Sequence, residues 1–294
     1  MKTAKIEFDT SKNVFKGIVD GKTVATRKTR ESIIKCLETK FDAKVDAADS
    51  EAVVAEPKEY FSVEERFQFI EQFTTLVAKK IVPSFIITGS GGIGKTTTVN
   101  KTLKKLGLKE DTIGSMGQSD YIVFKGYSTA KALYRMLYEN NGKVIVFDDC
   151  DSVFKDPIAA NVLKSALDSG ETRVISWGAE SLFGDDLPSR FEFTGRVIFI
   201  SNLPLKKFPQ ALISRSLLTD LTLTTEETVE RIETILNEVD APKTEKADAL
   251  EFIRKYAKQF TDLNVRSGMT VLKLRGALGK SFSRIALYTV TAGA

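Results

Sequence analysis

One segment of the chain constrains its fold more than any other: an apolar run that leads into glycines and then into a lysine. Residues 85–88 are typical of a short buried strand, and the residues from Lys95 onward are typical of the start of a helix. The connection between them, from Gly89 to Thr96, fits the pattern G-x-x-x-x-G-K followed by Thr or Ser. A strand, a glycine-rich turn and a helix in this order predict an α/β fold class, with a parallel sheet sandwiched by helices.

The glycine-rich turn also indicates a chemistry. Glycines allow main-chain N–H groups to converge on an anion, and the following helix adds the positive end of its dipole. Lys95 would place a positive charge on the terminal phosphates of a nucleotide, and Thr96 would offer a hydroxyl to Mg²⁺. A glycine-rich turn with an accidental lysine is the alternative, which the order of strand, turn and helix disfavours. The residues expected to bind the nucleotide are Gly89, Ser90, Gly91, Gly92, Ile93, Gly94, Lys95, Thr96 and Thr97.

A second apolar strand ends in acidic residues. Residues 144–147 form the strand, and Asp148, Asp149 and Asp151 follow. A parallel sheet would deliver Asp148 to the phosphate site as the Mg²⁺ carboxylate and would place Asp149 where a base orients or deprotonates water. A solvated acidic loop is the alternative, and Asp151 is the second candidate for the base.

The other patterns predict three parts. Strands at 121–124 and 197–200 alternate with helices, whereas helical spacing dominates after Leu223. Near the N-terminal end, two strand candidates flank Asp20-Gly21, a hairpin signal. We expect a small basic ββα domain at 1–41, a linker at 42–58, a nucleotide-binding α/β core at 59–224 and a helical lid at 225–294.

Positive charge is concentrated at one end of the chain. The net charge is +4, but residues 1–40 contain ten Lys or Arg and five Asp or Glu, so the remainder sums to −1. An excess of this kind points to an anionic partner such as nucleic acid. A solubility device and a protein-docking unit are the alternatives.

Composition excludes several function classes. The chain has no histidine, which rules out a Ser-His-Asp triad, a Cys-His dyad and a His-based zinc site. Two cysteines, Cys36 and Cys150, make no disulfide scaffold and favour a reducing compartment. The first residues lack the apolar stretch of a signal peptide, and no apolar run is long enough to span a membrane. We therefore expect a cytoplasmic protein.

The glycine-rich turn and the acidic strand end together resemble those of AAA+ ATPases, over about residues 60–290. The resemblance implies a P-loop ATPase that binds ATP and Mg²⁺, forms a hexamer-like homo-oligomeric ring and hydrolyses ATP. In that family the acidic pair is usually Asp-Glu, with the Glu as the base. This chain has Asp148 and Asp149 instead, as DNA-replication initiator ATPases of the family also do. The compact core also resembles AAA+ proteins of phages and mobile elements, which implies the host cytoplasm as its location.

Three more positions resemble functional elements of that family. Asn202, after a strand, resembles sensor 1, which helps to hold the attacking water. Arg215, in a Ser-Arg-Ser element, resembles the clamp-loader arginine that reaches the ATP of the neighbouring subunit. Arg266, at the start of a lid helix, resembles sensor 2, with Arg275 as the other choice. The alternatives are a strand-end turn, a local pair with Asp220 and a surface position, respectively.

Two segments of the core are candidates for contact with a polymer. Lys125-Gly126-Tyr127 follows the second strand, where AAA+ motors place a pore loop; an ordinary strand-to-helix turn is the alternative. Residues 173–177 and 190–193 are typical of a hairpin that resembles the presensor hairpin of one branch of the family. The residues that would line a channel there are Trp177, Phe183 and Arg190. For Trp177, packing of the hairpin is the alternative.

The expected function is therefore an ATP-hydrolysing ring that remodels or is loaded on nucleic acid, as a replication or recombination factor. A remodeller or unfoldase that acts on a protein substrate is the first alternative. A slow, nucleotide-gated scaffold is the second. No membrane partner is expected.

Overall fold

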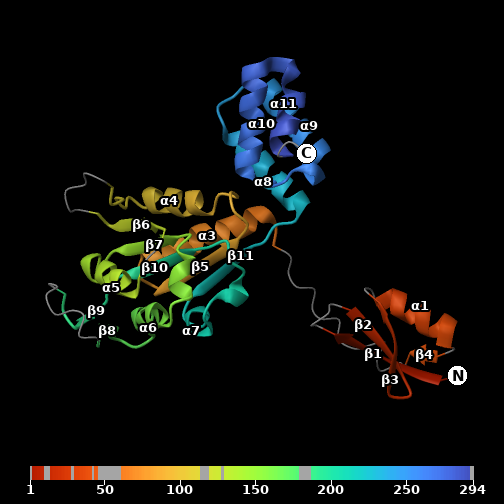
Figure 1. Cartoon of the computed structure of the whole chain (residues 1–294), viewed down its shortest axis with the longest axis horizontal. Coiled ribbons are helices and arrows are strands. Elements are labelled where there is room, and N and C mark those ends of the chain that lie inside the picture. Colours follow the sequence, from red (N-terminus) through yellow and green to blue (C-terminus); the bar gives the residue numbers. More distant parts are fainter. Residues whose placement is uncertain are drawn as a thin grey trace. The chain divides into compact units, whose positions relative to one another are not determined.

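The computed structural model describes eight stretches of the chain and divides it into two compact units. The described residues are 2–9, 14–27, 30–41, 43–45, 61–112, 119–126, 129–178 and 187–291. The units are Met1–Tyr60 and Phe61–Ala294 (Figure 1).

The first unit is a small sheet with one helix. Its elements are β1 (Lys2–Asp9), β2 (Val14–Val19), β3 (Lys22–Arg27), α1 (Arg30–Phe41) and β4 (Ala43–Val45). The strand order is β3-β2-β1-β4, with β1 and β4 parallel and the other pairs antiparallel. Ile33 and Leu37 of α1 are fully buried in a core with Ala4 and Val19.

The prediction for this unit was incomplete. The hairpin at Asp20-Gly21 and the helix are present, but β1 and β4 were not predicted. β4 lies inside the segment that was expected to be a linker. A three-residue strand has no period of its own to detect, and its pairing with β1 is what makes it a strand.

The second unit contains a five-stranded parallel sheet. Its strands are β5 (Ser84–Gly89), β6 (Tyr121–Lys125), β7 (Val144–Asp148), β10 (Arg196–Ile200) and β11 (Leu217–Leu221). They pair in the order β11-β5-β10-β7-β6. Because all five run in one direction, their carboxyl ends meet at one edge of the sheet. That edge carries the glycine-rich turn after β5, the acids after β7 and Asn202 after β10.

Helices cover both faces of this sheet. The helices α3 (Val63–Ala78) and α4 (Lys95–Lys105) pack on one face, while α5 (Ala130–Glu139), α6 (Pro157–Ala166) and the short α7 (Gln210–Ile213) pack on the other (Figure 1). Along β5 the faces alternate: Phe85 and Ile87 join the core under α3 and α4, and Ile86 joins the opposite one. A hairpin of β8 (Val174–Ser176) and β9 (Arg190–Glu192) lies beside α6.

The rest of the second unit is a helical bundle, which we call the lid. Its helices are α8 (Thr225–Glu238), α9 (Lys243–Tyr256), α10 (Val265–Leu278) and α11 (Phe282–Val290). They enclose a core of their own around Ile232, Ile253 and Val271. Lid and sheet domain meet where α8 contacts α3, including an ion pair between Arg66 and Glu227.

The predicted α/β class is confirmed, because the structure has a parallel sheet between two helical layers and a separate helical bundle. The strands β5, β6, β7 and β10 lie where they were predicted, whereas β11 was missed. The exact boundaries of the four predicted parts stay predictions. Among the described helices, none has the length and apolar composition needed to cross a lipid bilayer.

Candidate functional site

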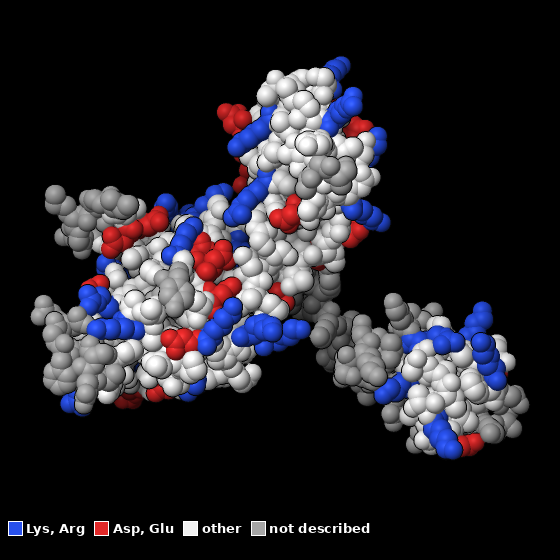
Figure 2. All heavy atoms as spheres, viewed as in Figure 1, with Lys and Arg blue, Asp and Glu red and all other residues white. Residues whose placement is uncertain are grey.

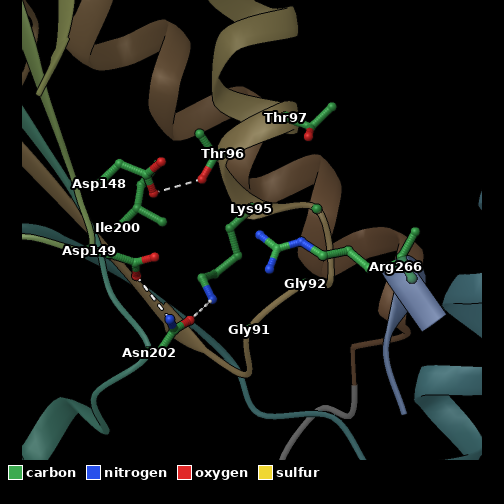
Figure 3. Close-up of a pocket in the computed structure, with 12 residues that line it drawn as sticks. Gly91, Gly92, Lys95, Thr96, Thr97, Asp148, Asp149, Ile200, Asn202 and Arg266 are labelled. Carbon is green, nitrogen blue, oxygen red and sulfur yellow. Dashed lines mark hydrogen bonds between the residues drawn. The ribbon is translucent and has the colours of Figure 1, made fainter. Parts of the chain in front are cut away.

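A pocket lies at the carboxyl edge of the parallel sheet, between the glycine-rich turn and the lid (Figure 3). Its solvent-accessible volume is about 200 Å³. The pocket brings together residues that are distant in the sequence. Those that line it are Gly91, Gly92, Gly94, Lys95, Thr96, Thr97, Asp148, Asp149, Ile200, Asn202, Val265 and Arg266.

The shape of the turn depends on glycine. Gly92 and Gly94 have φ values of 71° and 102°, which residues with a side chain rarely adopt. Gly94 is also the N-cap of α4, so the main-chain N–H groups that begin this helix face the pocket edge. One predicted binding residue contributes only its main chain, since the side chain of Ile93 is packed in the core at 1% exposure.

Lys95 is the centre of the site. Its Nζ donates to the carbonyl oxygens of Gly89 and Ser90, both at 2.7 Å, and to Oδ1 of Asn202 at 2.8 Å. Burial lowers the pKa of Lys95 to about 8, an effect that the negative charges of Asp149 and Asp148 oppose. The ammonium is therefore held by neutral carbonyl groups, and an anion in the pocket would meet a poorly solvated cation.

Two oxygen groups on neighbouring elements are suited to Mg²⁺. Thr96 Oγ1 donates to Oδ1 of Asp148 at 2.8 Å, and Asp148 is 6% exposed. Hard oxygen ligands of this kind fit Mg²⁺, which in nucleotide sites takes one or two protein groups together with phosphate oxygens and water. Within the described ranges no cluster of three or more His, Cys, Asp or Glu side chains could hold a metal alone. A bound Mg²⁺ would thus depend on ligand phosphates.

Asp149 is turned toward Asn202 by an unusual backbone. Its φ is 57°, in the left-handed region, while its N–H still donates to the carbonyl oxygen of Ile200 at 3.0 Å. Nδ2 of Asn202 donates to Oδ1 of Asp149 at 2.9 Å. Desolvation, together with the charge of Asp148, raises the pKa of Asp149. Asn202 consequently links the lysine to this carboxylate (Figure 3).

The second candidate base is placed differently. Asp151 begins a short 3₁₀ helix and accepts a hydrogen bond from the hydroxyl of Ser201. It is not among the residues that line the pocket. The geometry therefore favours Asp149.

The three candidate arginines differ in their position relative to the pocket. Arg266 extends from the start of α10 toward Lys95 (Figure 3). Arg275 pairs with Asp248 at 2.7 Å inside the lid, away from the pocket. Arg215 does not reach the pocket of its own chain: its guanidinium donates to the Ala211 carbonyl at 2.9 Å and lies 3.8 Å from Asp168.

The lid and the turn are joined directly. The N–H of Val265 donates to the carbonyl oxygen of Gly92 at 3.1 Å, and Asn264 caps α10 beside it. A methyl group on Gly92 would come within 2.9 Å of Asn264. This close approach is what carries Arg266 to the pocket.

Sequence reasoning did not place two charged residues at the site: Arg231 was not singled out, and Lys125 was considered only as part of a candidate pore loop. Arg231 of α8 lies over the ring of Phe67 at 3.5 Å and lines a second hollow next to Gly94. Lys125 pairs with Asp148 at 3.0 Å. The signal for Lys125 was present, because β6 and β7 are both five-residue strands that end in a charge. Nothing in the sequence distinguishes Arg231 from other arginines on a helix, because its position near the site depends on how the lid packs against α3.

The candidate polymer contacts are only partly described. Tyr127 and Phe183 lie outside the described residues, so their predicted roles are not tested. Trp177 packs against Tyr134, with ring centroids 5.5 Å apart, which fits the packing interpretation. Arg190 is exposed on β9.

Comparisons with known proteins give a coarse picture. No protein-family model matches the chain. An uncharacterised 36.7 kDa protein from the nrdC–mobD intergenic region of Enterobacteria phage T4 is 33% identical over 193 residues, which cover 60% of this chain and 57% of that protein. The chain thus spans little more than half the length of this relative.

Solved structures resemble the chain at low identity. A RuvB variant from Thermotoga maritima has a TM-score of 0.48 and 12% identity, covering 79% of this chain and 72% of the other. Domain III of the replication initiation protein DnaA from the same organism has a TM-score of 0.44 and 14% identity, covering 79% of this chain and 95% of the other.

Proposed function

We propose that this chain is a Mg²⁺-dependent ATPase of the AAA+ type, which works in a homo-oligomeric ring on nucleic acid. One observation carries the proposal: the lysine of the glycine-rich turn, the strand-end asparagine and a carboxylate form one chain of hydrogen bonds beside a Thr–Asp pair suited to Mg²⁺. A glycine-rich turn alone would bind an anion. The added carboxylate and asparagine are what hydrolysis requires.

Each residue of the site has a separate role in this proposal. The main-chain N–H groups of the turn and Lys95 bind the phosphates. Thr96 and Asp148 hold Mg²⁺, which when bound stabilises charge on the phosphate oxygens. Asp149 orients the attacking water and accepts its proton, and its raised pKa suits a base.

Asn202 contacts both the lysine and the proposed base. Its Oδ1 accepts from Lys95, and its Nδ2 donates to Asp149. A phosphate that draws Lys95 away would leave Oδ1 of Asn202 to accept from a water next to Asp149. This exchange would place the water only when nucleotide is present.

Two arginines complete the proposal. Arg266 faces the pocket from the lid and would contact the terminal phosphate. Arg215 is remote from the pocket of its own chain and would serve the site of a neighbouring copy. A guanidinium supplied in this way is worth three to five orders of magnitude in other phosphoryl-transfer enzymes.

Nucleic acid is proposed as the polymer because of the basic first unit. Residues 1–40 carry an excess of five positive charges over negative ones. Lys22, Lys35 and Lys40 are exposed, and the charged side chains on the face of this unit shown in Figure 2 are mostly Lys and Arg. Phosphate contacts of such lysines dominate non-specific affinity for nucleic acid.

The ATPase activity is tested by turnover of matched variants. Asp149→Asn should lower ATP turnover by about 100- to 1,000-fold with little change in nucleotide affinity, because it removes the base and keeps the shape. Asp151→Asn is the control and should retain most of the activity. Equal turnover of wild type and Asp149→Asn would overturn the role of Asp149.

The action of Arg215 in trans is tested by mixing variants. Arg215→Ala and Asp149→Asn should each be nearly inactive alone. In a mixture, some interfaces combine an intact Asp149 with an intact Arg215 from the next copy, so part of the activity should return. If mixing restores nothing while the two variants co-assemble, Arg215 does not act across the interface.

The polymer is tested by stimulation of turnover. Single- or double-stranded DNA should raise the ATPase rate, with an effect that falls steeply as salt is increased. Stimulation by an unfolded protein and not by DNA would support the protein remodeller instead.

A further inference from the structure

Lys125 is bound to the carboxylate that is proposed to hold the metal. In the parallel pairing of β6 and β7, Lys125 is in register with Asp148, so the two residues lie side by side at the carboxyl ends of neighbouring strands. The Nζ of Lys125 lies 3.0 Å from Oδ2 of Asp148. The sheet itself therefore positions this ion pair.

Both oxygens of Asp148 are engaged in this arrangement. Oδ1 accepts from the hydroxyl of Thr96 at 2.8 Å, and Oδ2 is paired with Lys125. The two partners differ in freedom, because the side chain of Lys125 is 66% exposed whereas that of Asp148 is 8% exposed. Asp148 is fixed at the floor of the pocket, and the lysine can swing out into solvent.

The pairing balances the charge of the site. Asp148 and Asp149 are adjacent carboxylates, and the charge of Asp148 contributes to the raised pKa of Asp149. The charges of Lys95 and Lys125 both act to lower the pKa of Asp149, and Lys125 pairs with Asp148 directly. Each of the two cations thus offsets part of the negative charge that would otherwise repel a polyphosphate.

We propose that Lys125 is a positioning residue that substitutes for the metal: it neutralises Asp148 in the metal-free site and gives up this pairing when Mg²⁺ binds. The inference rests on the proposed function, since it needs a nucleotide in the pocket. Thr96 and Asp148 would hold Mg²⁺ together with phosphate oxygens and water, so the metal would bring a second cation to the carboxylate that Lys125 already neutralises. Two cations at one carboxylate repel each other, so the lysine competes with the metal.

The proposal predicts that removing the charge of Lys125 changes the affinities for Mg²⁺ and for metal-free ATP in opposite directions. Lys125→Met removes the competing charge and keeps the aliphatic stem. The half-saturating Mg²⁺ concentration of the nucleotide-bound protein should then fall by about three- to tenfold, a modest change because the lysine is exposed and screened. Affinity for metal-free ATP should weaken by a similar factor, about three- to tenfold, because Asp148 now repels the phosphates unopposed.

The experiment is a titration of the full chain with ATP in EDTA, followed by a Mg²⁺ titration with a slowly hydrolysed ATP analogue, both by calorimetry. Lys125→Arg keeps the charge and should behave like wild type. The matched control is Lys104→Met, because Lys104 is also an exposed lysine, at 62%, with one ion pair at 3.1 Å, to Glu110. This control should change neither value, and thermal unfolding checks that each variant is folded.

The outcomes are distinct. Tighter Mg²⁺ together with weaker metal-free ATP in Lys125→Met supports the proposal. The proposal is overturned if the affinities for Mg²⁺ and for metal-free ATP are both unchanged, or if both weaken as they would in a damaged site. Neither result contradicts the ATPase proposal. If wild type binds no nucleotide with or without Mg²⁺, the proposed function itself fails and this inference fails with it.

Discussion

The two edges of the parallel sheet each bury a cation, and the difference between them separates a functional charge from a structural one. At the carboxyl edge, Lys95 is held by two carbonyl oxygens and Asn202. At the amino edge, Arg173 donates to the carbonyl oxygens of Ala166 and Gly195, at 2.9 and 2.8 Å, and lies over the ring of Phe193. Burial lowers both pKa values, to about 8 for Lys95 and about 10 for Arg173.

What the two cations face is different. Lys95 opens onto a pocket that also contains Asp149 and the glycine-rich turn. Arg173 also lines a hollow, but it ties the carboxyl end of α6 to the segment between β9 and β10 through contacts within the protein. A buried cation held by carbonyl groups is therefore not in itself a sign of function. Carboxylates lie near both cations, since Glu192 acts on Arg173 as Asp149 acts on Lys95, so the converging N–H groups of the glycine-rich turn make the distinction.

The largest expected effect is at Lys95. Lys95→Met should weaken nucleotide binding by about 1,000-fold, because a charge-assisted contact to phosphate is lost in a desolvated site. The free energy of unfolding should change by less than about 2 kcal/mol, because removing a poorly solvated charge stabilises the fold while the carbonyl groups of Gly89 and Ser90 lose their donor. Calorimetric titration and denaturant unfolding measure the two quantities. Full nucleotide affinity in this variant would remove the basis of the proposed site.

Arg173 should show the reverse pattern. Arg173→Met leaves two buried carbonyl groups without their donor and removes the contact with Phe193, so it should lower the free energy of unfolding by about 2–4 kcal/mol. Arg173→Lys should also be destabilised, because one ammonium does not span both carbonyls as the guanidinium does. The folded fraction should bind nucleotide like wild type. A selective loss of binding in that fraction would contradict the distinction between the two edges.

A third variant examines the link from Lys95 to the carboxylate. Asn202→Ala should lower ATP turnover by about 10- to 100-fold and change nucleotide affinity by less than about threefold, since it removes a group that acts on the water. Steady-state kinetics give both values. Asn141→Ala is the control at the amino edge, where Asn141 bonds to Glu192 and Thr194. Its turnover per folded molecule should be unchanged; an equal loss in both variants would point to general destabilisation.

The smallest effect is a proton taken up on binding. With a pKa of about 8, Lys95 is partly deprotonated at pH 8.5. Bound phosphates raise that pKa, so binding at pH 8.5 should take up a fraction of a proton. At pH 6.5 Lys95 is already protonated in both states and uptake should be near zero. Calorimetry in buffers of different ionisation enthalpy measures this, and buffer-independent enthalpies at pH 8.5 would refute it.

Much of the site could be predicted because its residues follow strands. Gly89–Thr96, Asp148 and Asn202 each come directly after an apolar run, and parallel strands bring their carboxyl ends to one edge. The sequence order alone therefore places them together. What it could not give is which partner each side chain takes. Asp149 and Asp151 look alike in the sequence, and the structure separates them: Asp149 lines the pocket and accepts from Asn202, whereas Asp151 accepts from Ser201.

The missed elements share a different cause. β11 has the sequence Leu-Leu-Thr-Asp-Leu and follows a serine and an arginine, so nothing in its own residues distinguishes it from a loop. Its five residues pair with β5 along their whole length, and this pairing defines the strand. Arg231 was missed for the same reason, since its position is set by its contact with the ring of Phe67, which is distant in the sequence. Local periodicity does not report long-range pairs.

The hydrogen bond between the lid and the turn has a mechanical meaning. In a trans peptide the C=O and N–H bonds point in opposite directions across one rigid plane. When Val265 holds the carbonyl of Gly92, it also sets the direction in which the N–H of Ile93 points. A rotation of the lid would therefore rotate this peptide plane and change the direction of the Ile93 N–H, one donor of the glycine-rich turn. No side chain would have to move.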